Sequence, residues 1–387
     1  MTQLHLNKKV NMTDELKDMG IGPQLIAALR RWSRFNPRRL YQLLRITANI
    51  KKSHRNRLRK MGQINGSIPV VVAISPTMCC NYNCQGCYSR NRSLENELST
   101  AELNALFGEA AELGVSVFVV TGGEPLLRSD LLDLIAHHHR LLYIIISNGT
   151  HITPETARRI ARSGNIVQLI SVEGFSNDTD DRRQTGAHAD AVKALQNLRD
   201  AGAFFGFAAM NTTVNTEQLG SERFMKEMSA LGCSIGLFTE YVPCGPQPHP
   251  EWVLDDHARA AFRRRILEIR RSGSFAIIQF PHDEYGPDNR CSAAGYLSLH
   301  INSQGGVEPC PFIPVAVDNI RNGGLRAACE SAFLRSIRGH PALLQRQRLA
   351  CSLFEHLDEI TALAGRSELV QLKLNIGEPG GESTPSD

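Results

Sequence analysis

From residue 68 to residue 239 the sequence alternates short apolar runs with segments long enough for helices, and this alternation limits the fold to a few architectures. The apolar runs occupy residues 68–74, 115–120, 142–146, 167–172, 204–209 and 234–239. Helical segments follow at residues 100–113, 130–139, 154–163, 189–201 and 222–231. Regular alternation of this kind indicates a parallel sheet, buried on both faces, with right-handed crossovers. We count six strand–helix units, which fit either a doubly wound sheet or an incomplete barrel.

Residues 1–65 are expected to be helical and are strongly basic. Helices are predicted at Asp14–Leu16, over residues 23–33 and from Pro37 onward, because proline suits the first helical position. Residues 19–94 contain 14 Lys or Arg and no Asp or Glu, although the whole chain has a net charge of only +4. A basic amphipathic helix within residues 30–60 can lie on an anionic membrane surface or face a phosphate-bearing partner. The alternative is a solvated helix packed beside the core.

After residue 281 the alternation ends. A strand, a turn and a second strand are predicted over residues 296–308, then helix at roughly 325–347 and near Ile360. Residues 377–387 are rich in Gly, Ser, Pro and Glu, a composition typical of disorder. No apolar run approaches the roughly 20 residues that span a bilayer, and residues 1–10 lack the apolar part of a signal peptide. The expected location is the cytoplasm, or the inner membrane face if the basic helix binds lipid.

Four of the ten cysteines lie within nine residues, directly after the first predicted strand. Thiols in a reducing compartment are better explained as metal ligands or catalytic groups than as disulfides. Cys80, Cys84 and Cys87 form a C-x3-C-x2-C loop, which can hold a four-iron cluster and leave one iron open to a small molecule. Zinc is the alternative, but zinc knuckles usually come as two C-x2-C pairs, and a second pair is not found in this sequence. Cys79 is interpreted as a spare small residue.

This loop resembles the cluster-binding loop of the radical S-adenosylmethionine (radical SAM) superfamily, whose signature has the same spacing. The resemblance covers roughly residues 66–355. It implies a partial (β/α)6 TIM-type barrel, a [4Fe–4S] cluster on Cys80, Cys84 and Cys87, and S-adenosylmethionine as the second cofactor. Many members have an aromatic residue just before the last cysteine, where this chain has Gly86; here the candidate adenine contact is Tyr88.

Motifs at the ends of the following strands extend the resemblance. Residues 122–125 read Gly-Gly-Glu-Pro, similar to the family motif that binds the methionine amino group. The candidate cofactor-binding residues in these motifs are Gly122, Gly123, Glu124, Pro125, Ser147, Asn148, Glu173 and Arg183. Arg183 corresponds to a carboxylate clamp, since a guanidinium binds a carboxylate through two hydrogen bonds; the alternative for it and Arg182 is a surface pair beside two aspartates. Thr212 and Asn215 are weaker candidates to line the adenosine.

The later cysteines resemble the auxiliary-cluster module of the SPASM and twitch subgroups. In these subgroups one cysteine precedes a hairpin and another follows it in a Pro-Cys step, as Cys291 and Cys310 do here. Cys351 would be a third ligand, and the small number of later cysteines fits the reduced, twitch-like form. The fourth ligand is left open between Cys244, Cys329, His356 and the substrate. The alternative is that these are buried structural thiols.

The sequence pattern and the resemblance together divide the chain into four parts: a helical extension (1–65), a radical SAM core (66–280), an auxiliary-cluster module (281–365) and a disordered tail (366–387). The resemblance implies reductive cleavage of S-adenosylmethionine to a 5′-deoxyadenosyl radical, which removes a hydrogen atom from a substrate, with flavodoxin or ferredoxin as reductant. The basic extension favours a small-molecule or lipid-linked substrate, with a peptide maturase as the alternative. A non-catalytic iron–sulfur carrier or scaffold is the rival of another class. A nucleic-acid partner is disfavoured, because the sequence shows no recognisable RNA-binding module.

Overall fold

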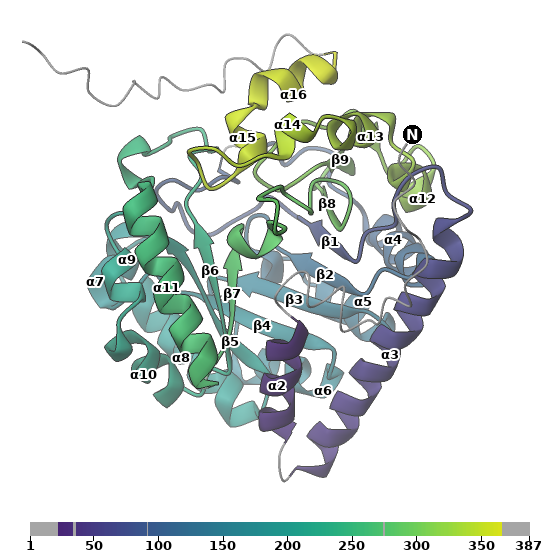
Figure 1. Ribbon diagram of the computed structural model, residues 1–387. Helices are drawn as coiled ribbons and strands as arrows, with labels where there is room; N and C mark the ends of the chain where they lie inside the picture. The colour runs from purple at the N-terminus through teal and green to yellow at the C-terminus, as the bar shows by residue number, and fades with distance from the viewer. Residues whose placement is uncertain (1–21, 34–35, 91, 274, 366–387) are drawn as a thin grey trace, which may run out of the picture.

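The computed structural model describes residues 22–33, 36–90, 92–273 and 275–365, which form one curved sheet with helices around it (Figure 1). The strands are β1 (Val71–Ile74), β2 (Val117–Val120), β3 (Leu142–Ser147), β4 (Ile166–Ser171), β5 (Phe205–Asn211), β6 (Ile235–Glu240), β7 (Ala276–Phe280), β8 (Ser298–Ile301), β9 (Gly306–Glu308) and β10 (Asp318–Asn319). Their order is β10-β9-β8-β1-β2-β3-β4-β5-β6-β7, with β1 to β7 parallel. This open parallel sheet is the partial barrel expected from the sequence.

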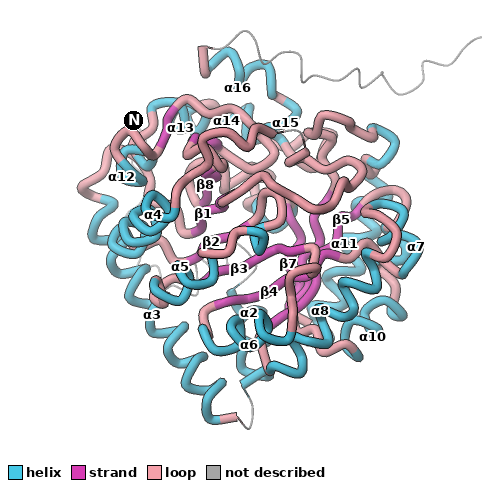
Figure 2. Tube along the Cα trace, turned by 180° about the vertical axis from the view of Figure 1, so that it is seen from behind, coloured by secondary structure: helices cyan, strands magenta, loops and turns pink. Residues whose placement is uncertain are grey.

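Helices connect the parallel strands and cover the outer face of the sheet, as Figure 2 shows from behind. They are α4 (Thr100–Leu113), α5 (Leu131–His137), α6 (Pro154–Ser163), α7 (Ser176–Arg182), α8 (Ala187–Ala201), α9 (Thr216–Leu219), α10 (Glu222–Ala230) and α11 (Asp256–Ser272). Side chains alternate between the faces of a strand, so Phe118 of β2 packs among the outer helices while Val117 and Val119 face the interior. Phe118 makes an edge-to-face contact with Phe107 of α4, with ring centroids 4.9 Å apart.

Strand β7 and helix α11 were not predicted, because the sequence reading ended with the strand at residues 234–239. β7 pairs with β6 from Ala276 to Phe280 and adds a seventh parallel strand. The strand has only five residues, one of them the polar Gln279, and ends before Pro281, so it is too short to distinguish from a loop by pattern alone. The arginines of α11 obscure its narrow buried face, which is made by Phe262, Ile266 and Ile269.

Two N-terminal helices, α2 (Gly22–Ser33) and α3 (Pro37–Met61), close the amino end of the barrel. Trp32 donates to the carbonyl of Ala203, Arg45 to that of Ser163 and Asn49 to that of His139. Each acceptor lies at the end of a barrel helix or between that helix and the next strand, so it belongs to the amino edge of the sheet. The buried apolar side chains of α2 and α3 pack on the inner face of the sheet, and α3 also contacts the outer helix α4. The predicted helices at 23–33 and from Pro37 are confirmed, while the one at Asp14–Leu16 lies outside the described residues.

The predicted hairpin is present and continues the core sheet. β8 pairs antiparallel with β9 and parallel with β1, so both edges of β1 are hydrogen-bonded. Beyond it lie α12 (Gly324–Cys329), α13 (Ala332–Gly339), α14 (Pro341–Leu344), α15 (Ser352–Glu355) and α16 (Leu357–Leu363). The continuous helix expected over 325–347 is thus broken, because Ser331 caps a new helix and Pro341 starts another. The expected disordered tail lies outside the described residues, among which a helix suited to crossing a membrane is not found.

The packing of α3 on the inner face predicts a difference between two neighbouring positions. Replacing the buried Ile46 by alanine should lower the free energy of unfolding by about 2–4 kcal/mol, because it removes apolar contacts with the sheet. Replacing the exposed Leu44 should change it by less than about 0.5 kcal/mol. Urea denaturation followed by circular dichroism measures both. Equal losses would show that α3 does not pack as described.

Candidate active site

A cavity of about 330 Å³ occupies the inside of the barrel and opens at the carboxyl ends of the strands. Its lining includes most of the candidate residues predicted from the sequence: Cys80, Cys84, Cys87, Tyr88, Gly122, Gly123, Glu124, Ser147, Asn148, Arg183 and Cys310. These residues come from different strand ends and from the loop after β9, which parallel strands bring to one edge of the sheet. Pro125, Glu173, Cys291 and Cys351 do not line the cavity but stand behind residues that do.

The loop that leaves β1 carries the three cysteines at the cavity mouth. The backbone N–H of Tyr82 donates to Sγ of Cys80 over 3.4 Å, and Cys87 Sγ lies 3.2 Å from the Ser89 hydroxyl. Burial raises the pKa of the Cys80 thiol to about 11, with the nearby Cys84 adding to the effect. Iron coordination requires thiolates, so metal binding must displace these protons. Three thiols on one short loop, with cavity space beside them, suit an iron–sulfur cluster better than a closed four-ligand zinc site.

The geometry of Gly86 explains why this chain departs from the aromatic pattern. Gly86 has a φ of 62°, and a Cβ there would come within 2.9 Å of the Trp252 ring and 3.2 Å of the Tyr241 ring. A side chain at this position is therefore excluded by backbone conformation and by packing. Tyr88 lines the cavity instead and is fixed by a 2.9 Å hydrogen bond between its hydroxyl and that of Thr121. Trp252 and Tyr241 were missed by sequence reasoning, since their loop shows no motif.

Glu124 organises the next two strand ends. Its carboxylate accepts hydrogen bonds from the Ser147 hydroxyl at 2.9 Å, the Asn148 backbone N–H at 2.7 Å and the Leu126 backbone N–H at 3.0 Å. Burial raises the pKa of Glu124, although these three hydrogen bonds lower it. The carboxylate thus points into a polar corner where Ser147 and Asn148 meet it across β2 and β3.

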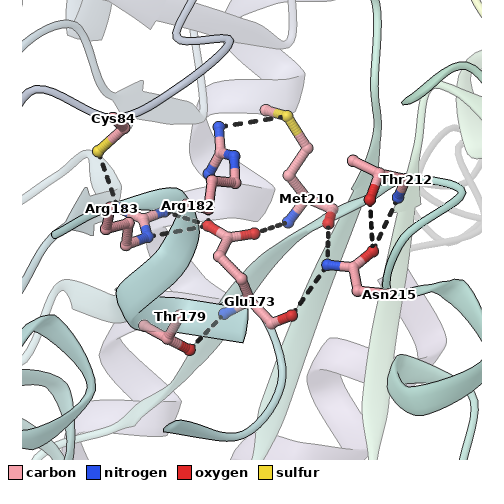
Figure 3. A network of polar contacts seen from close by, with 8 residues as sticks. All are labelled: Cys84, Glu173, Thr179, Arg182, Arg183, Met210, Thr212 and Asn215. Atoms are coloured by element: carbon pink, nitrogen blue, oxygen red, sulfur yellow. Dashed lines mark hydrogen bonds and ion pairs between the residues drawn. The ribbon is translucent and has the colours of Figure 1, made fainter. Parts of the chain in front are cut away.

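Glu173 forms the second buried polar network, shown in Figure 3. Its Oε1 lies 2.5 Å from both Arg182 and Arg183, and its Oε2 accepts from the Met210 backbone N–H at 3.0 Å. The arginine side chains are only 10% and 13% exposed, so the alternative of a surface pair is wrong. Burial lowers the pKa of Arg183, but the charges of Glu173 and Cys84 and the hydrogen bond to Glu173 together more than offset this effect, so the net shift is upward.

Arg183 also connects this network to the cysteine loop, because its Nη1 lies 3.9 Å from Sγ of Cys84. Burial raises the pKa of the Cys84 thiol, and the charges of Arg183 and Arg182 partly counter that rise. The two weaker candidates lie behind the network. Asn215 donates to the carbonyls of Glu173 and Met210 and accepts from Thr212, so both residues support the loop and are buried.

The later cysteines converge on one region. Burial raises the pKa of the Cys310 thiol, and the nearby Cys351 is the next cause. Burial likewise raises the pKa of the Cys351 thiol, and Cys291 is the next cause. Cys244, in the loop after β6, joins them: burial raises the pKa of its thiol, and Cys351 is the next cause. The pKa of the Cys329 thiol is raised by burial and then by Glu109 and Glu330 rather than by another cysteine, and Nδ1 of His356 is hydrogen-bonded to Glu359.

A hydrogen-bonded chain that the sequence did not reveal joins the hairpin to the cysteine loop. Ser75 at the end of β1 lies 2.9 Å from Nε2 of His300, whose Nδ1 lies 2.7 Å from Glu308. Glu308 also pairs with Arg92 at 3.5 Å, and Arg92 follows the loop. All but Arg92 are buried. Only the pairing of β8 with β1 brings these residues together, so sequence spacing carried no signal.

The close packing of Gly123 provides a test of the loop geometry. A Cβ at Gly123 would clash with the backbone of Met78 and Cys79, so Gly123→Ala should displace the loop and lower the iron bound after anaerobic reconstitution by at least about half. Gly62→Ala is the control, because nothing lies within 4 Å of a Cβ there. Iron content per chain is the measurement. Full iron in Gly123→Ala would contradict the described packing.

Comparison with known proteins agrees with this geometry. The sequence model that describes the radical SAM superfamily matches residues 74–219. The chain is 34% identical over 282 residues to an AdoMet-dependent heme synthase of Oleidesulfovibrio alaskensis, covering 65% of this chain and 72% of the relative. It is 32% identical over 269 residues to the mycofactocin maturase MftC of Mycobacterium tuberculosis, covering 63% and 65% of the two chains.

Solved structures share the fold. Streptococcus suis SuiB bound to its precursor peptide SuiA superposes with a TM-score of 0.61 and 18% identity, covering 74% of this chain and 70% of that one. The protein anSMEcpe with bound AdoMet gives a TM-score of 0.58 and 13% identity, covering 79% and 94%. With the cysteine loop, the partial barrel and these relatives in agreement, the chain belongs to the radical SAM superfamily, enzymes that use a [4Fe–4S] cluster and S-adenosylmethionine.

Proposed function

We propose that the chain holds its [4Fe–4S] cluster on Cys80, Cys84 and Cys87, binds S-adenosylmethionine beside it, and abstracts a hydrogen atom from a substrate in the barrel. When bound, these cofactors supply reductive cleavage of S-adenosylmethionine to methionine and a 5′-deoxyadenosyl radical. The observation that carries the proposal is a single cavity lined both by the three thiols and by the polar ends of β2 and β3. A flavodoxin or ferredoxin would provide the electron.

The residues around the cavity have distinct proposed roles. Gly122 and Gly123 let a ligand approach the backbone, since neither presents a side chain. Glu124 holds Ser147 and the backbone of Asn148 in place for the polar part of the cofactor. Arg183 faces both Glu173 and Cys84 and keeps a positive charge next to the cluster thiolates and the cofactor carboxylate. Tyr88 offers an aromatic ring at the cavity wall for the adenine.

The substrate is proposed to be a small or lipid-linked molecule rather than a peptide. SuiB and the mycofactocin maturase are relatives that favour the peptide alternative. Within the described part of residues 22–65, however, the chain forms only α2 and α3, and the edge of an extra strand for peptide pairing is not found there. A non-catalytic carrier is disfavoured because the polar side chains expected to bind the cofactor, Glu124, Ser147, Asn148 and Arg183, all line the cavity.

We also propose an auxiliary cluster on Cys291, Cys310, Cys351 and Cys244. Iron–sulfur clusters are typically held by four thiolates. Cys351 lies near Cys291, Cys310 and Cys244, whereas the acidic groups that act on the Cys329 thiol are Glu109 and Glu330. Cys310 also lines the main cavity. A cluster at this position could accept the electron left on an oxidised substrate. The boundary of the module near residue 281 stays a prediction, since β8 is part of the core sheet.

Cofactor cleavage is the direct test of the main proposal. The reconstituted protein with dithionite should convert S-adenosylmethionine to 5′-deoxyadenosine, measured by chromatography. Replacing Cys80, Cys84 and Cys87 together by alanine should abolish the product, because the cluster loses all its protein ligands. Arg183→Lys should reduce the rate by roughly tenfold or more through loss of the two-pronged guanidinium. Product formation by the triple variant would refute the assignment.

Counting iron tests the auxiliary site. The wild type should bind about eight irons, and Cys244→Ala should lose up to about four, with a matching change in the electron paramagnetic resonance spectrum of the reduced protein. Cys233→Ala is a matched control, because Cys233 and Cys244 are both 7% exposed but only Cys244 faces the other thiols. A wild type with about four irons, or equal iron in both variants, would rule out Cys244 as a ligand.

A further inference from the structure

Helix α3 has two faces with different surroundings. Ile50, His54 and Arg57 lie on the face that lines the barrel cavity, spaced four and three residues apart as helical geometry requires. The opposite face is exposed and begins with two large apolar side chains, Tyr41 at 66% and Leu44 at 61%. One helix therefore separates the cavity from solvent.

The exposed face of α3 becomes basic toward its C-terminal half. Lys51, Lys52, Arg55 and Arg59 are exposed and follow Leu44 along the same side of the helix. Residues 19–94 contain no acidic residue, so neutralising partners are absent from this stretch of sequence. Exposed apolar side chains beside a basic row are typical of helices that lie in the plane of an anionic lipid surface. A protein or peptide partner would need a groove on this face, whereas a bilayer needs only a ridge such as α3 presents.

The cavity behind α3 changes character along its length. At the carboxyl end it is lined by thiols, Ser147, Asn148 and Arg183, which suit the polar groups of a cofactor. Toward α3 the walls contributed by the strands are apolar and include Val117, Leu142 and Ile144, while α3 itself adds Ile50 and the polar His54 and Arg57. Strands of four to six residues are about 13–20 Å long, so a hydrocarbon chain can lie along this wall with one end near the cluster loop.

We propose that α3 docks the enzyme on an anionic membrane and that the apolar half of the cavity receives the hydrocarbon part of a membrane-resident substrate. This inference rests on the proposed function for its chemistry, since it names the substrate class of the same site. Tyr41 and Leu44 enter the lipid, the basic row meets the headgroups, and the cavity lies directly behind the docked helix.

Vesicle sedimentation tests the docking. The reconstituted full chain should sediment with vesicles of equal parts phosphatidylcholine and phosphatidylglycerol, and not with phosphatidylcholine alone. Lys51→Glu with Lys52→Glu should weaken binding roughly tenfold or more, and Leu44→Glu by about fivefold or more. Leu363→Glu on α16, also an exposed leucine, is the control and should change binding less than about twofold. Failure of the wild type to bind, or equal binding by all variants, would overturn docking by α3.

Displacement of a fluorescent fatty acid from the wild type tests the cavity, and two variants then test where the fatty acid binds. The wild type should bind cis-parinaric acid, and straight-chain alcohols should displace it with an affinity that rises about two- to fourfold per added CH₂ group. Val117→Phe narrows the apolar half of the cavity and should weaken binding of the long-chain alcohols most. Leu44→Glu should leave displacement unchanged. Displacement independent of chain length would overturn the hydrocarbon assignment. 5′-Deoxyadenosine formation in the same preparations separates failure of this inference from failure of the proposed function.

Discussion

The rest of the site depends on β1 being hydrogen-bonded along both edges. A four-residue strand at an open edge would leave its backbone groups unpaired. The position of the cysteine loop that follows it would then be poorly fixed. β8 removes the edge, and Ser75 meets His300 from 225 residues further along the chain. The loop is then held at its start by Glu97, which accepts from the Met78 backbone N–H at 2.6 Å, and beyond its end by Arg92 and Glu308. The hairpin thus fixes the thiols as well as carrying Cys310.

This arrangement buries negative charge, which is unfavourable, and two arginines compensate for it. Glu124 and the three thiols line the cavity and Glu173 lies behind it, and the thiols add negative charge when they bind metal as thiolates. A buried charge without a partner costs several kcal/mol. Arg182 and Arg183 both contact Glu173, and Arg183 extends to Cys84. The backbone of Gln85 in the cysteine loop donates to the carbonyl of Arg182 at 2.9 Å, so charge and position are set together. Glu173 therefore matters to the cluster loop although it does not line the cavity.

The parts of the site that could be predicted from the sequence are those whose residues lie in a short motif with a characteristic spacing. The three cysteines, the two glycines and Glu124 each lie in a short motif at a strand end, and parallel strands place such ends together. Trp252 and His300 could not be found in this way, because each reaches the site through the packing of distant segments, and for the same reason the sequence left Cys244 as one of several candidates for a fourth ligand. β7 was missed for a related reason: its five residues, one of them Gln279, become a strand only because β6 offers an edge to pair with.

The N-terminal helices cover the apolar surface that the partial barrel would otherwise expose at its amino end. A closed barrel fills its interior with layers of large side chains, but here small residues such as Ala73 and Ala208 face inward and leave a hollow. An open sheet with a hollow interior would expose apolar surface to water at its amino end. α2 contacts β7 while α3 contacts α4, so the two helices bridge that end of the sheet. The extension that looks like an appendage in the sequence is a wall of the cavity, and any account of the substrate must include it.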